Sequence, residues 1–313
     1  MNEIGVMGLG LDAGGSQTRW ALADVHGNVL AQGHVAGMSG LQLHTDHGLI
    51  ALRATLQALA QCVDHQIRGR AFCVYGGFTG LGEARDQARL LALFQEQFPV
   101  LASTSTLTHD MDIAFRSAFA PGAGYLVYAG TGSISAFIDA RGQLHRAGGR
   151  GGVLGDEGGG YWIAREALAW VWRQEDRSPG ASQRSPMAQR LFAAMGGDDW
   201  ACTRQYVYGG DRGTMGRLAL QVGASAHEDP VARDLLLRAG AALAELAQHM
   251  LHRFGPRPVT AAGRALLLSP LLEQGLRAAL PDDIVLRITP DLAAHLTAAH
   301  LAIHHNKTGH QPP

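Results

Sequence analysis

The chain has 313 residues, of which 46% are hydrophobic and 17% charged, and its formal net charge is −1. This composition favours a soluble globular protein of two domains, and the near-neutral charge gives no reason to expect binding to nucleic acid or to a membrane. No apolar run reaches the roughly 18 residues that span a bilayer, and no basic segment precedes an apolar block near residue 1, so we expect a cytoplasmic protein.

The first part of the chain predicts one compact α/β domain. Apolar runs separated by glycine-containing turns indicate strands, and leucines at three- and four-residue spacing indicate helices. In chain order, the expected elements are strands at 5–12, 18–24 and 29–35, a helix over 45–63, a strand at 71–75, a helix over 84–97 and a strand at 101–109. We expect this domain to cover residues 1–115.

Near residue 121 the pattern starts again, which suggests a duplicated domain without clear sequence identity between the copies. The expected elements are strands at 125–128, 134–138 and 143–147, a helical region from 157 with a break at 177–184, a helix over 230–254, a strand at 259–262, a helix over 271–279, a strand at 284–288 and a helix over 291–304. We expect the second domain to cover residues 116–304, with a helical insertion, and residues 305–313 to form a fraying tail.

Cysteine and lysine usage exclude several chemistries. The cysteines Cys62, Cys73 and Cys202 are scattered and form no C-x-x-C pair, so neither a disulfide framework nor a thiolate zinc site is supported. The only lysine is Lys307, whereas a Walker A loop, a protein kinase and a Schiff-base enzyme each need one at the site. If the chain binds ATP, it must use backbone amides, hydroxyls and a metal ion.

Two glycine-rich turns occupy corresponding places in the two halves. The first follows Asp12 and reads Gly14-Gly15-Ser16-Gln17-Thr18, and the second reads Gly130-Thr131-Gly132-Ser133. Amide and hydroxyl groups at two such turns could grip one polyphosphate from both sides, and Asp12 could hold Mg²⁺. Plain hairpins with a turn-capping aspartate would also explain the glycines. A dinucleotide fingerprint at Gly8-x-Gly10 is rejected, because a strand rather than a helix follows it.

Two more segments combine acidic residues with an element boundary. His109-Asp110-Met111-Asp112 lies where a strand ends and a helix begins. Asp110 could take the proton from a substrate hydroxyl that attacks the γ-phosphate, or it could simply cap the helix; Asp112 would be a first-turn acid or a second metal ligand. Residues 148–163 contain eight glycines around Arg150, Asp156 and Glu157. That much backbone freedom favours close approach to a ligand, although both acids could also cap a helix.

Together, these segments resemble the N-acetylglucosamine kinase and BadF/BadG/BcrA/BcrD ATPase family of the actin-like ATPase superfamily, which includes sugar kinases, Hsp70 and actin. The glycine-rich stretch is similar to the signature G-G-x-G-x-x-x-G-D-E-G-x-x-Y-W-I, and Val259-Thr260-Ala261-Ala262-Gly263 is a weaker match to the adenosine motif. The resemblance extends over residues 4–304. It implies an α/β fold of duplicated ribonuclease H-like domains, with ATP and sugar in an interdomain cleft.

The resemblance also implies a function and a set of site residues. The function is ATP- and Mg²⁺-dependent phosphorylation of an amino sugar, foremost N-acetylglucosamine to its 6-phosphate, by a homodimer. ATP would be bound by Gly14, Gly15, Ser16, Gln17, Thr18, Gly130, Thr131, Gly132, Ser133, Met215 and Gly263, with Asp12 as the Mg²⁺ ligand. The sugar would be bound by Ser39, Gln42, Gly149, Arg150, Gly151, Asp156 and Glu157, with Asp110 as general base on the 6-hydroxyl.

Three departures from the family pattern fall around the expected sugar. His109 stands where Asn often precedes the catalytic Asp, Leu41 where Asn is usual, and Arg150 where the animal enzymes have an aromatic residue. Glucosamine or another hexose is therefore an alternative acceptor. A BadF-type activator ATPase would need cysteines grouped for an iron–sulfur cluster, and a repressor-type sugar kinase a Cys-rich zinc motif; neither is present. A non-catalytic sugar sensor stays open, although the chain keeps Asp12, Asp110 and both turns.

Overall fold

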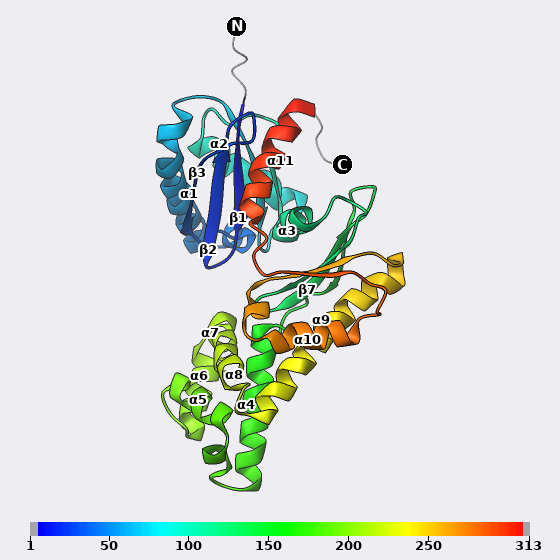
Figure 1. Ribbon diagram of the computed structural model, residues 1–313. Helices are drawn as coiled ribbons and strands as arrows, with labels where there is room; N and C mark the ends of the chain where they lie inside the picture. Colours follow the sequence, from blue (N-terminus) through cyan, green and yellow to red (C-terminus); the bar gives the residue numbers. More distant parts are fainter. Residues whose placement is uncertain (1–5, 309–313) are drawn as a thin grey trace. The chain divides into compact units, whose positions relative to one another are not determined.

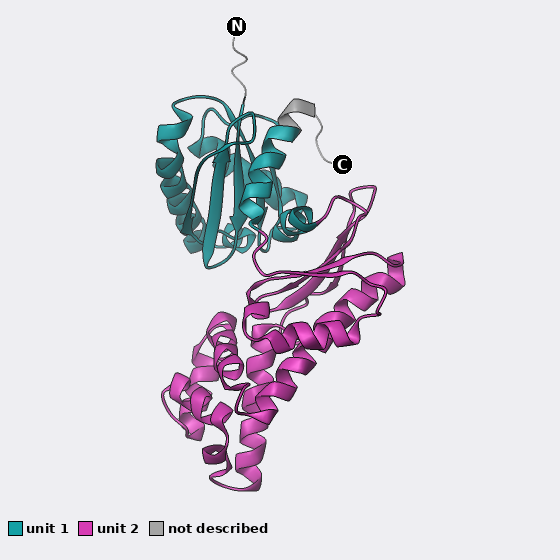
Figure 2. Ribbon diagram, in the orientation of Figure 1, with its two compact units in different colours: residues 1–118, 293–313 teal, residues 119–292 magenta. Residues whose placement is uncertain are grey.

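The computed structural model describes residues 6–308, with side chains to residue 304, and is drawn in Figure 1. It divides into two compact units, which Figure 2 colours separately: unit 1 comprises residues 1–118 and 293–313, and unit 2 comprises residues 119–292. Among the described helices, none combines the length and apolar character that crossing a bilayer requires.

Unit 1 contains a five-stranded mixed sheet in the order β3-β2-β1-β4-β5. The strands are β1 (Met7–Ala13), β2 (Gln17–Ala23), β3 (Val29–Ala36), β4 (Phe72–Phe78) and β5 (Thr106–His109). The first three form an antiparallel meander, whereas β1, β4 and β5 run parallel. The carboxyl ends of these three strands therefore lie along one edge of the sheet, which is where ligands of open α/β sheets bind.

Helices cover both faces of this sheet. On one face, α1 (Asp46–Ile67) and α2 (Ala84–Gln97) bury side chains such as Leu56 and Phe94 against the strands. On the other face, α3 (Asp110–Ala118) and α11 (Ala294–Thr308) pack small side chains, and Ile113 with them, against Tyr75. A short 3₁₀ helix, η1 (Gly40–His44), precedes α1.

The position of α11 corrects the expected domain division. We expected the closing helix in a second domain over 116–304, but α11 packs against β1 of unit 1 (Figure 2). A Cβ on Gly10 would lie 2.1 Å from the backbone N of Ala299 and the carbonyl O of His295, and one on Gly8 2.3 Å from the Ala299 carbonyl O. Both glycines therefore let the helix backbone approach the strand. The helix continues to Thr308, and the rest of the expected tail lies outside the described residues.

Unit 2 repeats the topology of unit 1. Its five-stranded sheet has the order β10-β9-β6-β7-β8, with strands β6 (Tyr125–Ala129), β7 (Ser133–Ile138), β8 (Leu144–Gly148), β9 (Val259–Ala262) and β10 (Leu286–Thr289). Again the first three strands are an antiparallel meander, and β6, β9 and β10 run parallel. The same strand order and the same directions in both units confirm the duplicated α/β fold.

Unit 2 differs from unit 1 in its helical region. Three of its helices begin with the same local sequence, an N-cap Ser or Asp followed by a proline. The side chains of Ser185, Asp229 and Ser269 accept backbone N–H groups from the first turn of the helix that each precedes. The helices are α4 (Gly160–Arg177), α5 (Pro186–Met195), α6 (Trp200–Gly209), α7 (Arg212–Arg217), α8 (Ala219–Ser225), α9 (Pro230–Phe254) and α10 (Pro270–Ala279), with 3₁₀ turns η2 (Ala181–Arg184) and η3 (Arg264–Leu267). The predicted break at 177–184 separates α4 from α5.

Candidate functional site

Two candidate carboxylates lie at the carboxyl edge of the unit 1 sheet. Asp12 of β1 pairs in register with Gly77 of β4, and Gly77 pairs with Thr108 of β5. Asp110 begins α3 directly after β5. A Cβ on Gly77 would lie 3.0 Å from the Cα of Asp110, so this glycine allows α3 to start close to β4. The fold thus brings the expected metal ligand and the expected base to one sheet edge.

Asp12, the expected Mg²⁺ ligand, is partly exposed and is bonded to an arginine. Its side chain is 25% exposed, and Oδ2 accepts a 2.8 Å hydrogen bond from Arg19 Nη2 on the neighbouring strand. Among the described residues, no cluster of three or more His, Cys, Asp or Glu could enclose a metal ion. Mg²⁺ at phosphate-transfer sites is usually held by one or two carboxylates together with waters and substrate phosphates. The Asp12 carboxylate, which is partly exposed and paired with Arg19, is compatible with that kind of site.

The first turn, between β1 and β2, is open to solvent at its tip. A 3.1 Å hydrogen bond from Gly14 N to Gln17 O closes it, and Gly15, Ser16 and Gln17 are exposed. Thr18 differs from its neighbours because it is fully buried and its hydroxyl accepts a 3.0 Å hydrogen bond from Met38 N. The Thr18 side chain therefore supports the segment that leads to Ser39.

Ser39 and Gln42 cap the 3₁₀ helix η1. Gln42 Oε1 accepts from Ser39 N at 2.8 Å, and Ser39 Oγ accepts from Leu41 N at 3.2 Å and lies 3.1 Å from the Thr79 carbonyl, to which it donates. This is a capping box, in which two side chains satisfy the first free amides of a helix. The polar groups expected to contact sugar are thus engaged locally, and Leu41 is the side chain that reaches solvent, at 66% exposure.

Asp110 is in close contact with the residue before it. His109 Nδ1 lies 2.6 Å from Asp110 Oδ1 and accepts a 3.1 Å hydrogen bond from Met111 N. The Asp110 Oδ1 atom is buried and accepts no hydrogen bond from the described residues. A single ring nitrogen either carries a proton or offers a lone pair. It can therefore attract the Asp110 carboxylate only when it is protonated, and it can accept from Met111 only when it is not.

Asp112 belongs to a buried structural network rather than to the open edge. Its Oδ1 accepts hydrogen bonds from the Tyr75 hydroxyl at 2.7 Å and from Arg116 Nε at 2.9 Å. Burial, with the Asp112 charge beside it, raises the pKa of Tyr75 well above its usual range, so the hydroxyl stays a donor. These contacts favour the first-turn structural role for Asp112 over the second-metal-ligand interpretation.

The second turn, between β6 and β7, is bonded to the start of α4. Gly160 N donates to Gly130 O at 2.9 Å, and Tyr161 N donates to Thr131 O at 2.8 Å. Ser133 is buried, and its hydroxyl donates to the Glu157 carbonyl at 2.6 Å. Thr131, by contrast, is exposed at the tip. The helix start therefore fixes this turn and leaves Thr131 available to a ligand.

Asp156 links the second turn to α7. Its backbone is left-handed, with φ of 65°, and the residue is 3% exposed. Its carboxylate packs against Gly132, where a Cβ would lie 2.6 Å from Oδ2, and the same oxygen forms an ion pair with Arg212 of α7. No local sequence pattern relates Arg212 to Asp156, because the two residues are far apart in the chain.

Met215 and Gly263 are also placed near the second turn. Met215 is buried in α7, and its neighbour Gly216 would bring a Cβ within 3.2 Å of Thr131 Cγ2. Gly263 has φ of 101°, and a Cβ there would lie 2.3 Å from the carbonyl O of Ala129, the last residue of β6. Gly263 is therefore a glycine because two chain segments touch at that point.

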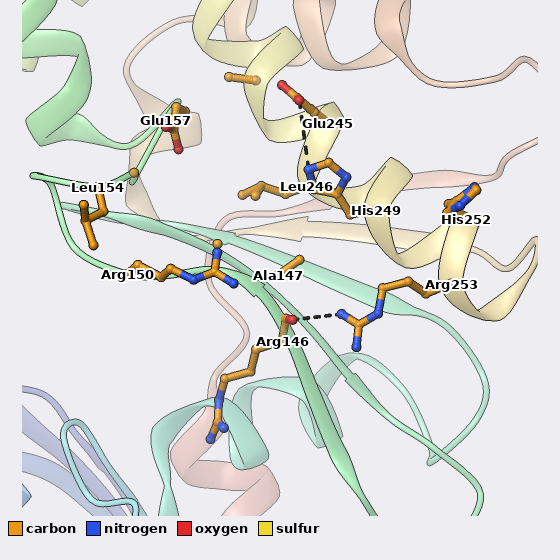
Figure 3. A pocket seen from close by; sticks show the side chains of 13 residues that line it. Arg146, Ala147, Arg150, Leu154, Glu157, Glu245, Leu246, His249, His252 and Arg253 are labelled. Atoms are coloured by element: carbon orange, nitrogen blue, oxygen red, sulfur yellow. Dashed lines mark hydrogen bonds and ion pairs between the residues drawn. The ribbon is translucent and has the colours of Figure 1, made fainter.

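The glycine-rich segment places its two acids in different surroundings. Gly149 and Gly151 have left-handed backbones and flank the exposed Arg150. A pocket of about 600 Å³ lies between this segment with β8 and the C-terminal half of α9, and Arg150 and Glu157 line it (Figure 3). Glu157 thus faces the pocket, whereas the preceding Asp156 is buried beneath Arg212.

Comparison with known proteins places the chain in a family. Residues 9–285 match the BadF/BadG/BcrA/BcrD ATPase family. The chain belongs to this family. The match covers both glycine-rich turns and every strand except β10 and the first two residues of β1, and it confirms the resemblance on which the expected fold rests.

Similar proteins include kinases of amino sugars. The chain is 24% identical over 194 residues to N-acetyl-D-glucosamine kinase of Dictyostelium discoideum, and 24% identical over 173 residues to N-acetylmuramic acid/N-acetylglucosamine kinase of Clostridium acetobutylicum. These alignments cover 58% and 54% of this chain and span only 60% and 54% of the two relatives. The crystal structure of a candidate N-acetylglucosamine kinase from Chromobacterium violaceum has a TM-score of 0.70 at 25% identity, over 94% of this chain and 99% of the other.

Proposed function

We propose that the protein is an ATP-dependent sugar kinase that transfers the γ-phosphoryl group to a hydroxyl of an amino sugar. The observation that carries the proposal is the pair of carboxylates, Asp12 and Asp110, at the carboxyl edge of β1 and β5. Phosphoryl transfer to an alcohol needs a base for the hydroxyl and a cation at the phosphates. Membership of an ATPase family and the names of the two kinase relatives support the same reaction.

In this proposal each carboxylate has one task. Asp110 accepts the proton of the acceptor hydroxyl while the hydroxyl oxygen bonds to the γ-phosphorus and the bond to the bridging oxygen of ADP breaks. Asp12 would hold Mg²⁺, which supplies positive charge to the phosphate oxygens when it is bound. The exposed amides and hydroxyls of the first turn and of Thr131 would bind the phosphates.

We further propose N-acetylglucosamine as the acceptor and its 6-phosphate as the product. Both named kinase relatives include N-acetylglucosamine in their names, and one also includes N-acetylmuramic acid. The exposed Leu41 and Arg150 are the departures that could shift this choice, so glucosamine and other hexoses are the alternative acceptors. The expected homodimer and cytoplasmic location belong to the same proposal; light scattering of the purified chain measures the first.

The test is ADP release from ATP and Mg²⁺ across a panel containing N-acetylglucosamine, N-acetylmuramic acid, glucosamine and glucose. We expect release that depends on N-acetylglucosamine. Asp110→Asn should lower kcat by about 10²- to 10⁴-fold while sugar binding, measured by calorimetry, persists. Asp46→Asn, an exposed acid in the first turn of α1, is the control and should keep normal turnover.

Each other result has a defined meaning. Release with a different sugar would keep the mechanism and change the acceptor. Near-normal turnover in Asp110→Asn would remove the general-base assignment. ATP binding without release for any sugar would favour the activator ATPase or the non-catalytic sensor.

A further inference from the structure

The proposed reaction needs positive charge at the phosphates, and the arginine beside the first turn, Arg19, is paired with Asp12. ATP carries several negative charges, and enzymes that transfer phosphoryl groups use Lys, Arg or metal ions to neutralise them. This chain has a single lysine, Lys307, which lies near its end. An arginine is therefore the residue to look for at the phosphate-binding turns, and its planar fork of five N–H donors suits phosphate oxygens.

Arg212 is anchored beside the second turn. Its Nη2 group contacts Asp156 Oδ2, and that same oxygen would lie 2.6 Å from a Cβ on Gly132. One carboxylate therefore separates the guanidinium from the middle of the turn. Farther along the short helix, Gly216 lies against Thr131, so α7 meets the turn directly there and through Asp156 at Arg212.

In the Arg212–Asp156 ion pair, the arginine is exposed to solvent and the aspartate is buried. The Arg212 side chain is 52% exposed, whereas that of Asp156 is 3% exposed. The Tyr161 ring lies under the guanidinium at 5.8 Å from its centroid. Asp156 contacts Nη2, and among the described residues Nη1 and Nε have no hydrogen-bond partner. The exposed half of the Arg212 side chain is therefore accessible to a ligand.

The backbone at Asp156 also points to a site. A non-glycine residue with φ of 65° is uncommon and costs free energy that other contacts must offset. Around it, Gly132 and Gly159 are glycines because a Cβ on either would lie under 3 Å from its neighbour, the Asp156 carboxylate or the Gly132 backbone. The strained backbone of Asp156 and the close packing at Gly132 and Gly159 together hold the Asp156 carboxylate under Arg212.

We propose that Arg212 is a nucleotide-binding residue that donates to phosphoryl oxygens of ATP at the Gly130–Ser133 turn, with Asp156 as the positioning residue that orients its guanidinium. The inference rests on the ATP-binding part of the proposed function but not on the identity of the sugar. Asp156, which the family resemblance assigns to sugar binding, would then act chiefly through Arg212.

Binding experiments on the full chain test this inference directly. Calorimetry with Mg²⁺ and AMPPNP, and separately with adenosine, compares wild type with Arg212→Gln, Arg212→Lys and Arg217→Gln. Arg217 ends the same helix, is exposed and donates to Thr214 Oγ1 at 2.8 Å, which makes it the matched control. Thermal melts of each variant identify any loss of folding.

Arg212→Gln should raise the Kd for AMPPNP by about 10- to 100-fold, the loss of one or two hydrogen bonds to a charged group, and leave the Kd for adenosine unchanged. Arg212→Lys keeps the charge without the fork and should fall between wild type and Arg212→Gln. Arg217→Gln should bind both ligands as wild type does. If Arg212→Gln fails to fold, the Arg212→Lys comparison carries the test.

Several results would overturn the inference. Equal weakening of AMPPNP and adenosine, no weakening at all, or a change confined to sugar affinity would each show that Arg212 does not bind phosphate. A wild-type protein that binds no AMPPNP would overturn it as well. AMPPNP binding that depends on Arg212, without ADP release for any sugar, would instead uphold the inference and reject the kinase proposal.

Discussion

The two sheets have the same topology, but their glycine-rich turns are built differently. In unit 1 the turn is closed by one backbone hydrogen bond, its tip is exposed, and Asp12 stands one residue before the end of β1. In unit 2 the corresponding residue of β6 is Tyr128, and the turn is fixed by the start of α4 and by Asp156 with Arg212. Both units therefore keep the hairpin and an acid–arginine pair near it. In unit 1 the pair is Asp12 with Arg19 on the two strands of the hairpin, and in unit 2 it is Asp156 of the glycine-rich segment with Arg212 of α7.

Of the effects expected from this comparison, the largest comes from replacing the residues that differ near the ends of β1 and β6. Asp12→Asn removes the carboxylate charge proposed for Mg²⁺ and should lower kcat by about 10²- to 10³-fold, the usual scale for one electrostatic group at a reacting phosphate. Tyr128→Phe, at the equivalent place in unit 2, should keep kcat within severalfold. Steady-state ADP release at increasing Mg²⁺ measures both. Equal losses in the two variants would mean that the two strand ends are not functionally distinct.

The second prediction concerns how tightly each turn is packed. Gly132→Ala would place a Cβ 2.6 to 2.8 Å from the Asp156 carboxylate, whereas a Cβ on Gly15 in the first turn meets nothing within 4 Å. Neither glycine has a positive φ, so space rather than backbone conformation decides the outcome. Gly132→Ala should lower the free energy of unfolding by about 1–3 kcal/mol, while Gly15→Ala should change it by less than about 0.5 kcal/mol. Calorimetric Tm values compare them, and similar Tm values would contradict the difference in packing.

Local patterns predicted most of the secondary structure. The expected helices over 84–97 and 230–254 coincide with α2 and α9, because apolar periodicity and helix caps depend only on residues close together in the sequence. The strand expected at 101–109 is only Thr106–His109. The residues before it form a turn, closed by a hydrogen bond from Ser105 N to Ala102 O, which β-propensity does not reveal.

These local patterns could not predict which distant elements pack against one another. The glycines at positions 8 and 10 show a need for close approach but do not identify α11 as the partner. Likewise, the glycine-rich segment indicated a site, yet the pairing of Asp156 with Arg212 depends on how the helical region folds back. Sequence therefore located the turns and the acids, and the structure was needed to show which of their side chains are engaged elsewhere.

The smallest expected effect concerns the helical region that only unit 2 contains. Asp229 caps α9 through Val231 N and Ala232 N, and it also accepts from Ser185 Oγ at 2.7 Å and Met187 N at 3.0 Å at the start of α5. Burial favours the neutral acid, but these hydrogen bonds outweigh it and lower the pKa of Asp229. One carboxylate thus joins the start of α5 to the start of α9.

A carboxylate whose folded pKa is lowered stabilises the fold above its unfolded pKa, and that stability disappears as pH falls through the folded value. Asp229→Asn should therefore lower the free energy of unfolding by about 1–2 kcal/mol near pH 7, and its deficit relative to wild type should shrink below about pH 4. Asp234→Asn, on an exposed turn of the same helix, is the control and should differ from wild type by less than about 0.5 kcal/mol. Tm measured from pH 3 to 7 gives the comparison. A deficit that stays constant with pH would show that the size of the side chain, not its charge, joins α5 to α9, and the region peculiar to unit 2 would then depend on packing alone.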